Sequence, residues 1–261
     1  MFSPLLNFIG RILARYLNKT ITGHIPIVVY STEELAGILR PGDILLVEGN
    51  LRVSVAIKYI TQSTWSHAAI FVGDRLKSQN ENGEPLTLIE ADVQRGVVAV
   101  PISKYCCFQT RICRPVGLTM EDCERVVDFA VSRLGDSYDL KNVIDLARYL
   151  LPTPPVPTRW RRRLLALGCG EPTMSICSTL IAQAFQSVRY PILPIVTHGD
   201  AADPKSREIL HIRHHSLFAP RDFDLSPYFQ IIKPALALNF NYKNIIWGDL
   251  NLGSTSSDKG V

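Results

Sequence analysis

The stretch Ser63–Asp74, STWSHAAIFVGD, decides the fold and also raises the question of function. Its residues 68–72 are apolar and read as a buried β-strand, yet His67 stands at the start of that strand. A titratable ring at this place is either a structural residue or a catalytic group held at the end of a sheet. The surrounding sequence favours the catalytic reading.

Strand-like runs surround this stretch and are separated by turn residues. They are DILLVEG (43–49), LTLIEA (86–91), GVVAVPI (96–102), CFQTRICRPV (107–116) and YFQIIKPA (228–235). The runs at 67–73, 86–91 and 96–102 follow one another with only polar loops between them, which predicts a meander of antiparallel strands.

Helical patterns fill most of the remaining chain. They cover 32–39, capped by Ser31 or Thr32, then 120–134, capped by Thr119, and then 138–151, 159–168 and 175–188. The segment 53–63 is compatible with a short helix, but its apolar residues are ambiguous between the helical and the strand period. A meander of strands followed by helices predicts an α+β fold with the sheet packed against helices. We predict a main domain at 31–235, preceded by an amphipathic helix and linker at 1–30. A partly disordered extension follows at 236–261.

Composition and charge narrow the function classes. The net charge is +4, which is too mild to indicate nucleic-acid binding, so we expect none. The six cysteines form no C-x-x-C pair, which argues against zinc and against a disulfide framework and favours the cytoplasm. The histidines of HIRHH (211–215) have no cysteine or carboxylate at ligand spacing, so we expect no metal and no cofactor.

Two basic segments are candidates for contact with a membrane surface. The N-terminal segment alternates apolar residues with Arg11 and Arg15 at helical spacing, and Arg159–Arg163 form a cluster around Trp160. Each has a simpler reading, because an amphipathic helix usually packs on its own domain and a basic cluster is often a solvated face. Peripheral membrane contact and a solvated surface both stay open.

One of the six cysteines is placed for nucleophilic chemistry. Cys177 lies in the first turn of an apolar helix, with Ser175 as the expected cap. The free backbone N–H groups of that turn favour a thiolate and can also stabilise an oxyanion. The other cysteines read as small buried hydrophobic residues.

A thiolate nucleophile needs a base, and the base needs an orienting group. If 67–73 and 86–91 pair as a hairpin, His67 comes opposite or nearly opposite Glu90 and on the same face of the sheet. The carboxylate then fixes the tautomer of the imidazole, which explains the histidine of the opening stretch.

Six motifs in a fixed order carry a family resemblance. They are LRPGDILLVEG, WSHAAIFVG, LIEADVQRGVVAVPISKY, RLGDSYDL, CSTLIAQAF and FAPRDFDLSPYF, together spanning roughly 38–230. In this order, with histidine before cysteine, the chain resembles the circularly permuted NlpC-type, papain-like cysteine hydrolases of the YaeF/YiiX group, relatives of lecithin:retinol acyltransferase. The resemblance implies Cys177 as nucleophile, His67 as base, Glu90 as third member and Tyr138 near the oxyanion.

The first functional hypothesis is therefore an enzyme. A cysteine hydrolase or acyltransferase would cleave an amide, ester or thioester through an acyl-cysteine intermediate, with a lipid or a cell-wall peptide as substrate. The alternative is a catalytically inactive, membrane-associated binding module of the same fold. We expect an acyl or peptide substrate and a cytoplasmic location that is peripheral to the membrane if the basic segments bind lipid.

Overall fold

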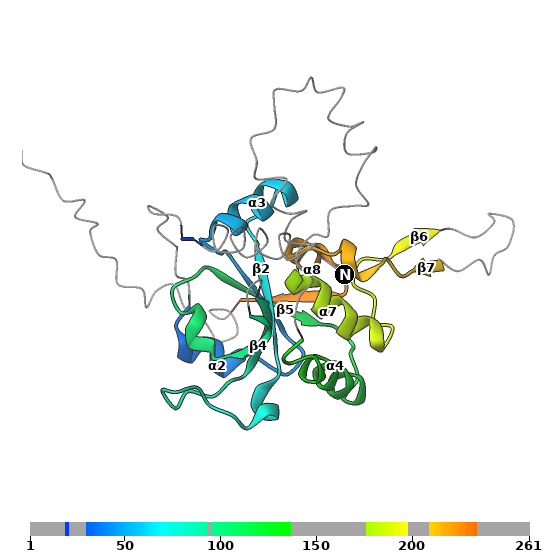
Figure 1. Cartoon of the computed structure of the whole chain (residues 1–261). Coiled ribbons are helices and arrows are strands. Elements are labelled where there is room, and N and C mark those ends of the chain that lie inside the picture. Colours follow the sequence, from blue (N-terminus) through cyan, green and yellow to red (C-terminus); the bar gives the residue numbers. More distant parts are fainter. Residues whose placement is uncertain (1–18, 21–29, 93–94, 137–175, 198–208, 234–261) are drawn as a thin grey trace, which may run out of the picture.

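The computed structural model describes residues 19–20, 30–92, 95–136, 176–197 and 209–233 (Figure 1). In chain order the elements are α2 (Thr32–Ile38), β1 (Ile44–Val47), α3 (Arg52–Thr61), β2 (His67–Phe71), η1 (Gly73–Leu76), β3 (Leu88–Asp92), β4 (Gly96–Val100), η2 (Ile102–Tyr105), β5 (Thr110–Pro115), α4 (Met120–Ser132), α7 (Ile176–Ser187), β6 (Ile195–Thr197), β7 (Ile209–His211), η3 (His215–Leu217), α8 (Pro220–Leu225) and β8 (Phe229–Ile232).

Six strands form one antiparallel sheet in the order β4-β3-β2-β1-β5-β8. The predicted meander is confirmed as β2, β3 and β4, which are neighbours in the sheet. β1 lies between β2 and β5, so β2 is a central strand with a hydrogen-bonded neighbour on each side. A central strand holds its first residue, His67, more rigidly than an edge strand would.

The two faces of the sheet bury different layers. Alternate residues of β2 point to opposite faces, so Ala68 and Ile70 join a core with α4, α7 and α8, while Ala69 and Phe71 join a core with α2 and η2. Figure 1 shows α4 and α7 on one side of the sheet and α2 on the other. The α+β architecture with helices against an antiparallel sheet is therefore confirmed.

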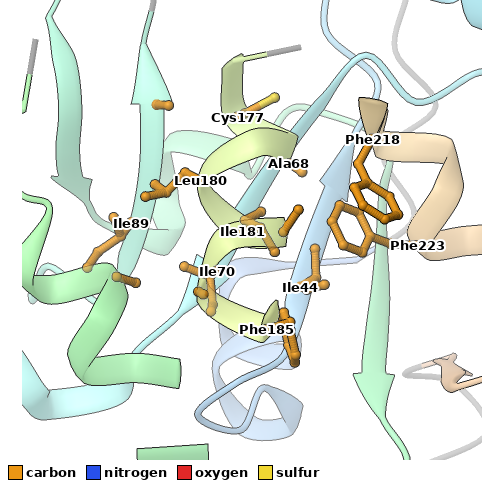
Figure 2. Packing of buried hydrophobic residues seen from close by; sticks show 14 of the residues in the cluster. Ile44, Ala68, Ile70, Ile89, Cys177, Leu180, Ile181, Phe185, Phe218 and Phe223 are labelled. Atoms are coloured by element: carbon orange, nitrogen blue, oxygen red, sulfur yellow. The ribbon is translucent and has the colours of Figure 1, made fainter. Parts of the chain in front are cut away.

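Helix α7 packs against β2 and β3 along the centre of the larger core (Figure 2). Leu180, Ile181 and Phe185 recur at helical spacing and are buried. The Phe185 ring lies 5.3 Å from the ring of Phe229 in β8 and 5.4 Å from that of Tyr190. Packing along this face fixes where the first turn of α7 lies over the sheet.

Replacing Phe185 by alanine is expected to lower the free energy of unfolding by about 3–5 kcal/mol, because it leaves a cavity among buried aromatic rings. Urea denaturation followed by circular dichroism measures this. The control is Met120→Ala on α4, whose side chain is 82% exposed and should change stability by no more than about 0.5 kcal/mol. Equal effects of the two variants would contradict the placement of α7 in the core.

Several predicted elements differ from the structure or lie outside its described part. The segment 53–63, whose period is ambiguous in the sequence, contains most of helix α3 (Arg52–Thr61). Ser31, one of the two predicted caps, is the N-cap of α2 and forms a capping box with Glu34. The hairpin β6–β7 is not among the elements predicted from the sequence, because its strands have three residues each, too few to leave a periodic signal. The predicted helices at 138–151 and 159–168 and the extension at 236–261 are not among the described residues, and of the predicted N-terminal helix and linker at 1–30 only residues 19, 20 and 30 are described.

Two structural findings bear on the predictions of membrane contact and of the absence of a metal site. Within the part of the chain that the structure describes, every helix is too short or too polar to span a bilayer. In the same part, no three side chains of histidine, cysteine, aspartate or glutamate are grouped as metal ligands.

Candidate active site

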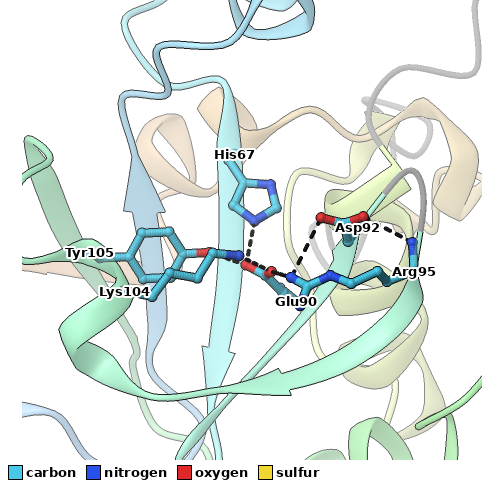
Figure 3. A network of polar contacts seen from close by, with 6 residues as sticks. All are labelled: His67, Glu90, Asp92, Arg95, Lys104 and Tyr105. Carbon is cyan, nitrogen blue, oxygen red and sulfur yellow. Dashed lines mark hydrogen bonds and ion pairs between the residues drawn. The ribbon is translucent and has the colours of Figure 1, made fainter. Parts of the chain in front are cut away.

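His67 and Glu90 lie on adjacent strands and contact each other directly. His67 Nε2 is 2.9 Å from Glu90 Oε2 (Figure 3). The register pairs Glu90 with Ala69, so the two residues are displaced by two positions and are not directly opposed. Because His67 and Ala69 share a face of β2, the predicted common face is correct, and the longer glutamate side chain spans the diagonal.

Glu90 is a buried carboxylate with several donors around it. Its side chain is 1% exposed. Oε2 accepts hydrogen bonds from His67 and from the hydroxyl of Tyr105, and Oε1 accepts one from the Lys104 ammonium. The Arg95 guanidinium lies 3.7 Å from Oε1. The carboxylate therefore has a charged or polar partner on both oxygens, as a buried anion requires.

These partners decide the charge of Glu90. Burial by itself raises the pKa of a carboxyl group, but the hydrogen bond and charge of His67, followed by those of Lys104, outweigh it and hold the pKa well below its usual value. Burial, followed by the negative charge of Glu90, raises the pKa of Tyr105 well above its usual value. Glu90 is thus an anion at neutral pH, and Tyr105 remains a protonated donor to it.

Tyr105, Lys104 and Arg95 were not among the sequence-predicted site residues. Tyr105 and Lys104 lie on η2, the short turn that follows β4. Tyr105 belongs to the same hydrophobic core as Leu88 of β3. Both residues occur in one of the six motifs. The sequence gives no signal, however, that a turn 14 or 15 residues after Glu90 folds back and contacts it. The pattern of two adjacent polar residues after an apolar strand is common in loops.

Cys177 is the second residue of α7 and is 4% exposed. Its predicted place in the first turn of a helix is confirmed, although the expected cap Ser175 lies outside the described residues. Figure 2 shows Cys177 at one end of α7 and Phe185 near the opposite end. In that first turn the backbone N–H groups have no partner within the helix, which makes the turn a site for negative charge.

Cys177 and His67 interact with each other. Burial alone would lower the pKa of His67, but its charge interaction and hydrogen bond with Cys177, together with those of Glu90, raise it from 6.5 to about 10. Because Nε2 is engaged by Glu90, Nδ1 is the nitrogen available to the sulfur. The raised pKa keeps His67 protonated at neutral pH, so an imidazolium lies between the Glu90 carboxylate and the sulfur of Cys177.

The arrangement depends on the position of His67 at the end of its strand. Cys177 belongs to the core on the α7 face, whereas Tyr105, which holds Glu90, belongs to the core on the other face. At the first residue of β2 the ring lies where the two faces meet and contacts a group from each. A histidine further along the strand would reach one face only.

A cavity of about 390 Å³ adjoins these side chains. Its walls include Cys177, His67 and Glu90 together with residues from β1, the start of α3, the end of β3 and η2. The volume is near the lower end of the roughly 300–1,000 Å³ found for small-molecule sites. Cys177, His67 and Glu90 therefore line one cavity together.

The other candidate residues lie elsewhere or are not described. Tyr138 and Arg159–Arg163 are outside the described residues. Cys113 is buried in β5, where burial raises the pKa of its thiol, and Cys123 donates to the carbonyl of Pro41. The rings of His214 and His215 lie next to each other, with centroids 4.1 Å apart. His215 is the first residue of η3, and His214 immediately precedes it.

Comparison with known proteins adds to this geometry. Residues 38–149 match the family described as permuted papain-like amidase enzymes, YaeF/YiiX, C92. Among curated proteins, none matches the chain. The solved structure of the metalloprotein yiiX from Escherichia coli O157:H7 is similar, with 15% identity, a TM-score of 0.44, and coverage of 74% of this chain and 96% of that chain.

The match confirms the resemblance to the YaeF/YiiX family and the papain-like α+β fold. It includes His67 and Glu90 and ends before Cys177. The assignment of the sulfur to the site therefore depends on the contact of Cys177 with His67 in this structure.

Proposed function

From the resemblance to permuted papain-like amidases, we propose that this chain is a cysteine hydrolase or acyltransferase that forms an acyl-cysteine intermediate on Cys177. The family match supports the cysteine-hydrolase type of function. The observation that carries the finer proposal is the interaction of His67 with Cys177 on one side and with Glu90 on the other.

The proposed reaction begins with the thiolate of Cys177 attacking the carbonyl carbon of an amide, ester or thioester. The oxyanion of the tetrahedral intermediate accepts hydrogen bonds from the backbone N–H groups at the start of α7, and Tyr138 is proposed to add another. The imidazolium of His67 gives its proton to the departing amine, alcohol or thiol as the bond to the carbonyl carbon breaks. The acyl group is then bound to the sulfur.

In the second half of the reaction, neutral His67 accepts a proton from water or from another acceptor, which attacks the acyl-cysteine. The product acid or transferred acyl group leaves, and the thiolate is restored. Glu90 stabilises the imidazolium in both halves and keeps the ring oriented, since its carboxylate is itself held by Tyr105 and Lys104.

The proposed substrates are acyl lipids or cell-wall peptides, and the proposed location is cytoplasmic and peripheral to the membrane. The basic N-terminal segment and Arg159–Arg163 support the membrane contact through their attraction to anionic headgroups. An inactive binding module of the same fold is the second candidate function. It would need the same cavity but no reactive sulfur.

Alkylation with iodoacetamide distinguishes an enzyme from a binding module. Because the imidazolium of His67 persists to a pKa of about 10, Cys177 is expected to react rapidly at pH 6.5–9 with little dependence on pH. In His67→Ala the rate at pH 6.5 should fall at least about tenfold and then rise with pH, as for an ordinary thiol of pKa about 8.5. Peptide mass spectrometry measures the rate at each cysteine.

The internal controls are Cys113 and Cys123, for which burial is the main cause of a raised pKa. Their slow alkylation should be the same in both proteins. If Cys177 reacts as slowly as these two thiols, or if His67→Ala leaves its rate unchanged, the binding module is the better description.

A further inference from the structure

Cys106 and Cys107 are adjacent cysteines on the turn that follows η2. Cys107 is exposed and Cys106 is partly exposed, so the prediction that these two are small buried hydrophobic residues is wrong. Their Sγ atoms are 3.4 Å apart, within hydrogen-bond distance of each other. The two residues therefore form a pair of neighbouring thiols that small molecules in the solvent can reach.

Cys106 and Cys107 are the two central residues of a β-turn. The N–H of Phe108 donates to the carbonyl of Tyr105 at 3.1 Å and closes this turn. Cys106 has φ −57° and ψ −26°, values typical of the first central residue of a type I turn. The backbone torsions of the two cysteines close the turn and also limit how closely the two sulfur atoms can approach. A change in the sulfur–sulfur distance is therefore expected to change the turn.

The turn begins at a residue that holds Glu90. The Tyr105 hydroxyl donates to Glu90 Oε2, and the ammonium of Lys104, the residue before it, donates to Oε1 (Figure 3). The Tyr105 ring is buried and contacts the Phe108 ring edge-on, with centroids 6.1 Å apart, so the two ends of the turn pack together. A change in the turn would move donors away from a buried carboxylate, and that carboxylate is the counter-ion of His67.

We propose that Cys106 and Cys107 are a redox-modification site, at which a low-molecular-weight disulfide oxidises the pair and thereby weakens the hold of η2 on Glu90. The thiolate of Cys107 attacks one sulfur of the small disulfide, so a mixed disulfide forms and one small thiolate leaves. Cys106, once deprotonated, attacks the sulfur of Cys107, and the second small thiolate leaves as the bond between the two residues forms. The pair has then lost two electrons, and the small disulfide has been reduced to two thiols, which take up the two protons.

The bond between these adjacent cysteines should be easy to reduce again. Neighbouring Cα atoms are about 3.8 Å apart, whereas most disulfides join Cα atoms separated by about 4.4–6.8 Å. The sulfur atoms must approach from 3.4 Å to a bond length of about 2.05 Å, and closing so small a ring constrains the backbone torsions of the turn as well. Because strained disulfides are the more readily reduced ones, the modification is expected to form under an oxidising pulse and to be reversed by thiols.

Oxidised glutathione, added to the full-length protein at pH about 8, tests whether the bond forms. The alkaline pH is needed because the hydrogen bond with Cys107, followed by burial, raises the pKa of Cys106. After the remaining thiols are blocked with iodoacetamide, trypsin cuts after Lys104 and Arg111 and releases residues 105–111, which contain no other cysteine. This peptide should carry no alkyl group and be two hydrogens lighter than the reduced peptide, and dithiothreitol should restore both alkylation sites. A peptide that stays fully alkylated, or that retains glutathione, overturns the proposal.

The alkylation rate of Cys177 tests the effect of the disulfide on the site. After oxidation and removal of glutathione, iodoacetamide at pH 6.5 should modify Cys177 at least about threefold more slowly than in the reduced protein, because the imidazolium of His67 is less well held by Glu90. At pH 9 the difference should be smaller, since an ordinary thiol is itself ionised there. Dithiothreitol should restore the original rate.

The matched control is the double variant with Cys106→Ser and Cys107→Ser, which keeps every residue of the site but has no thiol in the turn. The same treatment should leave its Cys177 rate unchanged, which separates the effect of the pair from direct oxidation of Cys177. A disulfide between Cys106 and Cys107 without an effect on Cys177, an effect equal at both pH values, or an equal effect in the double variant overturns the proposal. Neither measurement uses a substrate, so these outcomes leave the proposed function as it stands.

Discussion

Replacing Cys177 by alanine should abolish turnover of the ester that the enzyme uses best, with a loss of roughly 10⁴-fold or more. The reason is that the variant has no atom able to form the acyl intermediate, while the imidazole of His67 alone only assists attack by water. Cys177→Ser should lose nearly as much, because a hydroxyl is far less acidic than a thiol and the imidazolium cannot maintain it as an anion. Release of p-nitrophenolate from a p-nitrophenyl ester at saturating concentration measures the rate.

The matched control for this prediction is Cys113→Ala. Cys113 is as deeply buried as Cys177 but lies in β5, so its removal should leave the rate unchanged and lower only the stability. A rate that survives in Cys177→Ala, or one that is lost equally in Cys113→Ala, would contradict the assignment of the nucleophile.

Replacing Glu90 by alanine is expected to lower the free energy of unfolding by about 3–5 kcal/mol. The variant leaves the ring of His67, the Tyr105 hydroxyl and the Lys104 ammonium without their shared acceptor. Glu90→Gln keeps the shape of the side chain and one oxygen but loses the charge, so it should cost roughly 1.5–3 kcal/mol. Both variants should also slow acylation, because the imidazolium loses its counter-ion.

The effect of Glu90→Gln should depend on pH in a defined direction. The pKa of Glu90 is below its ordinary value of 4.5 in the folded protein, so its stabilisation is present above pH 4.5 and is lost as the pH falls. The pKa of His67 is raised from 6.5 to about 10, so its contribution is complete below pH 6.5 and is lost as the pH rises toward 10. The difference between the wild type and Glu90→Gln should therefore be largest between pH 4.5 and 6.5.

Urea denaturation at pH 3.5, 5.5 and 9 measures this dependence. The control is Asp128→Asn, which removes an ion pair with Arg75 in which both side chains are about half exposed. Such an exposed pair contributes at most about 1 kcal/mol, and its loss should show no maximum near pH 5.5. A stability difference for Glu90→Gln that does not change with pH would contradict the charged state assigned to Glu90 and His67.

Much of the local structure follows from short stretches of the sequence. The apolar run after His67 predicts β2, and the apolar stripe of residues 177–185 predicts α7, because side-chain periodicity depends on neighbours only a few residues apart. The capping pattern at Ser31 and the start of α7 before Cys177 depend on the same short range. Pairing 67–73 with 86–91 as a hairpin also placed Glu90 close to His67 and on the same face of the sheet. It did not predict that Glu90 lies opposite Ala69, two residues along the strand from His67.

The sequence by itself predicted the meander, the other strands of the large sheet and the helices α2, α4 and α7, but not the hairpin β6–β7 or helix α8. Through the order of the motifs it also predicted the choice of Cys177, His67 and Glu90. Only the tertiary structure decided that Tyr105 and Lys104 hold Glu90, that His67 joins the two faces of the sheet, and that the charged walls of the cavity pair among themselves. The physical reason is that periodicity and capping act between near neighbours, whereas these contacts form where segments distant in the chain pack, and packing depends on the shape of the whole core.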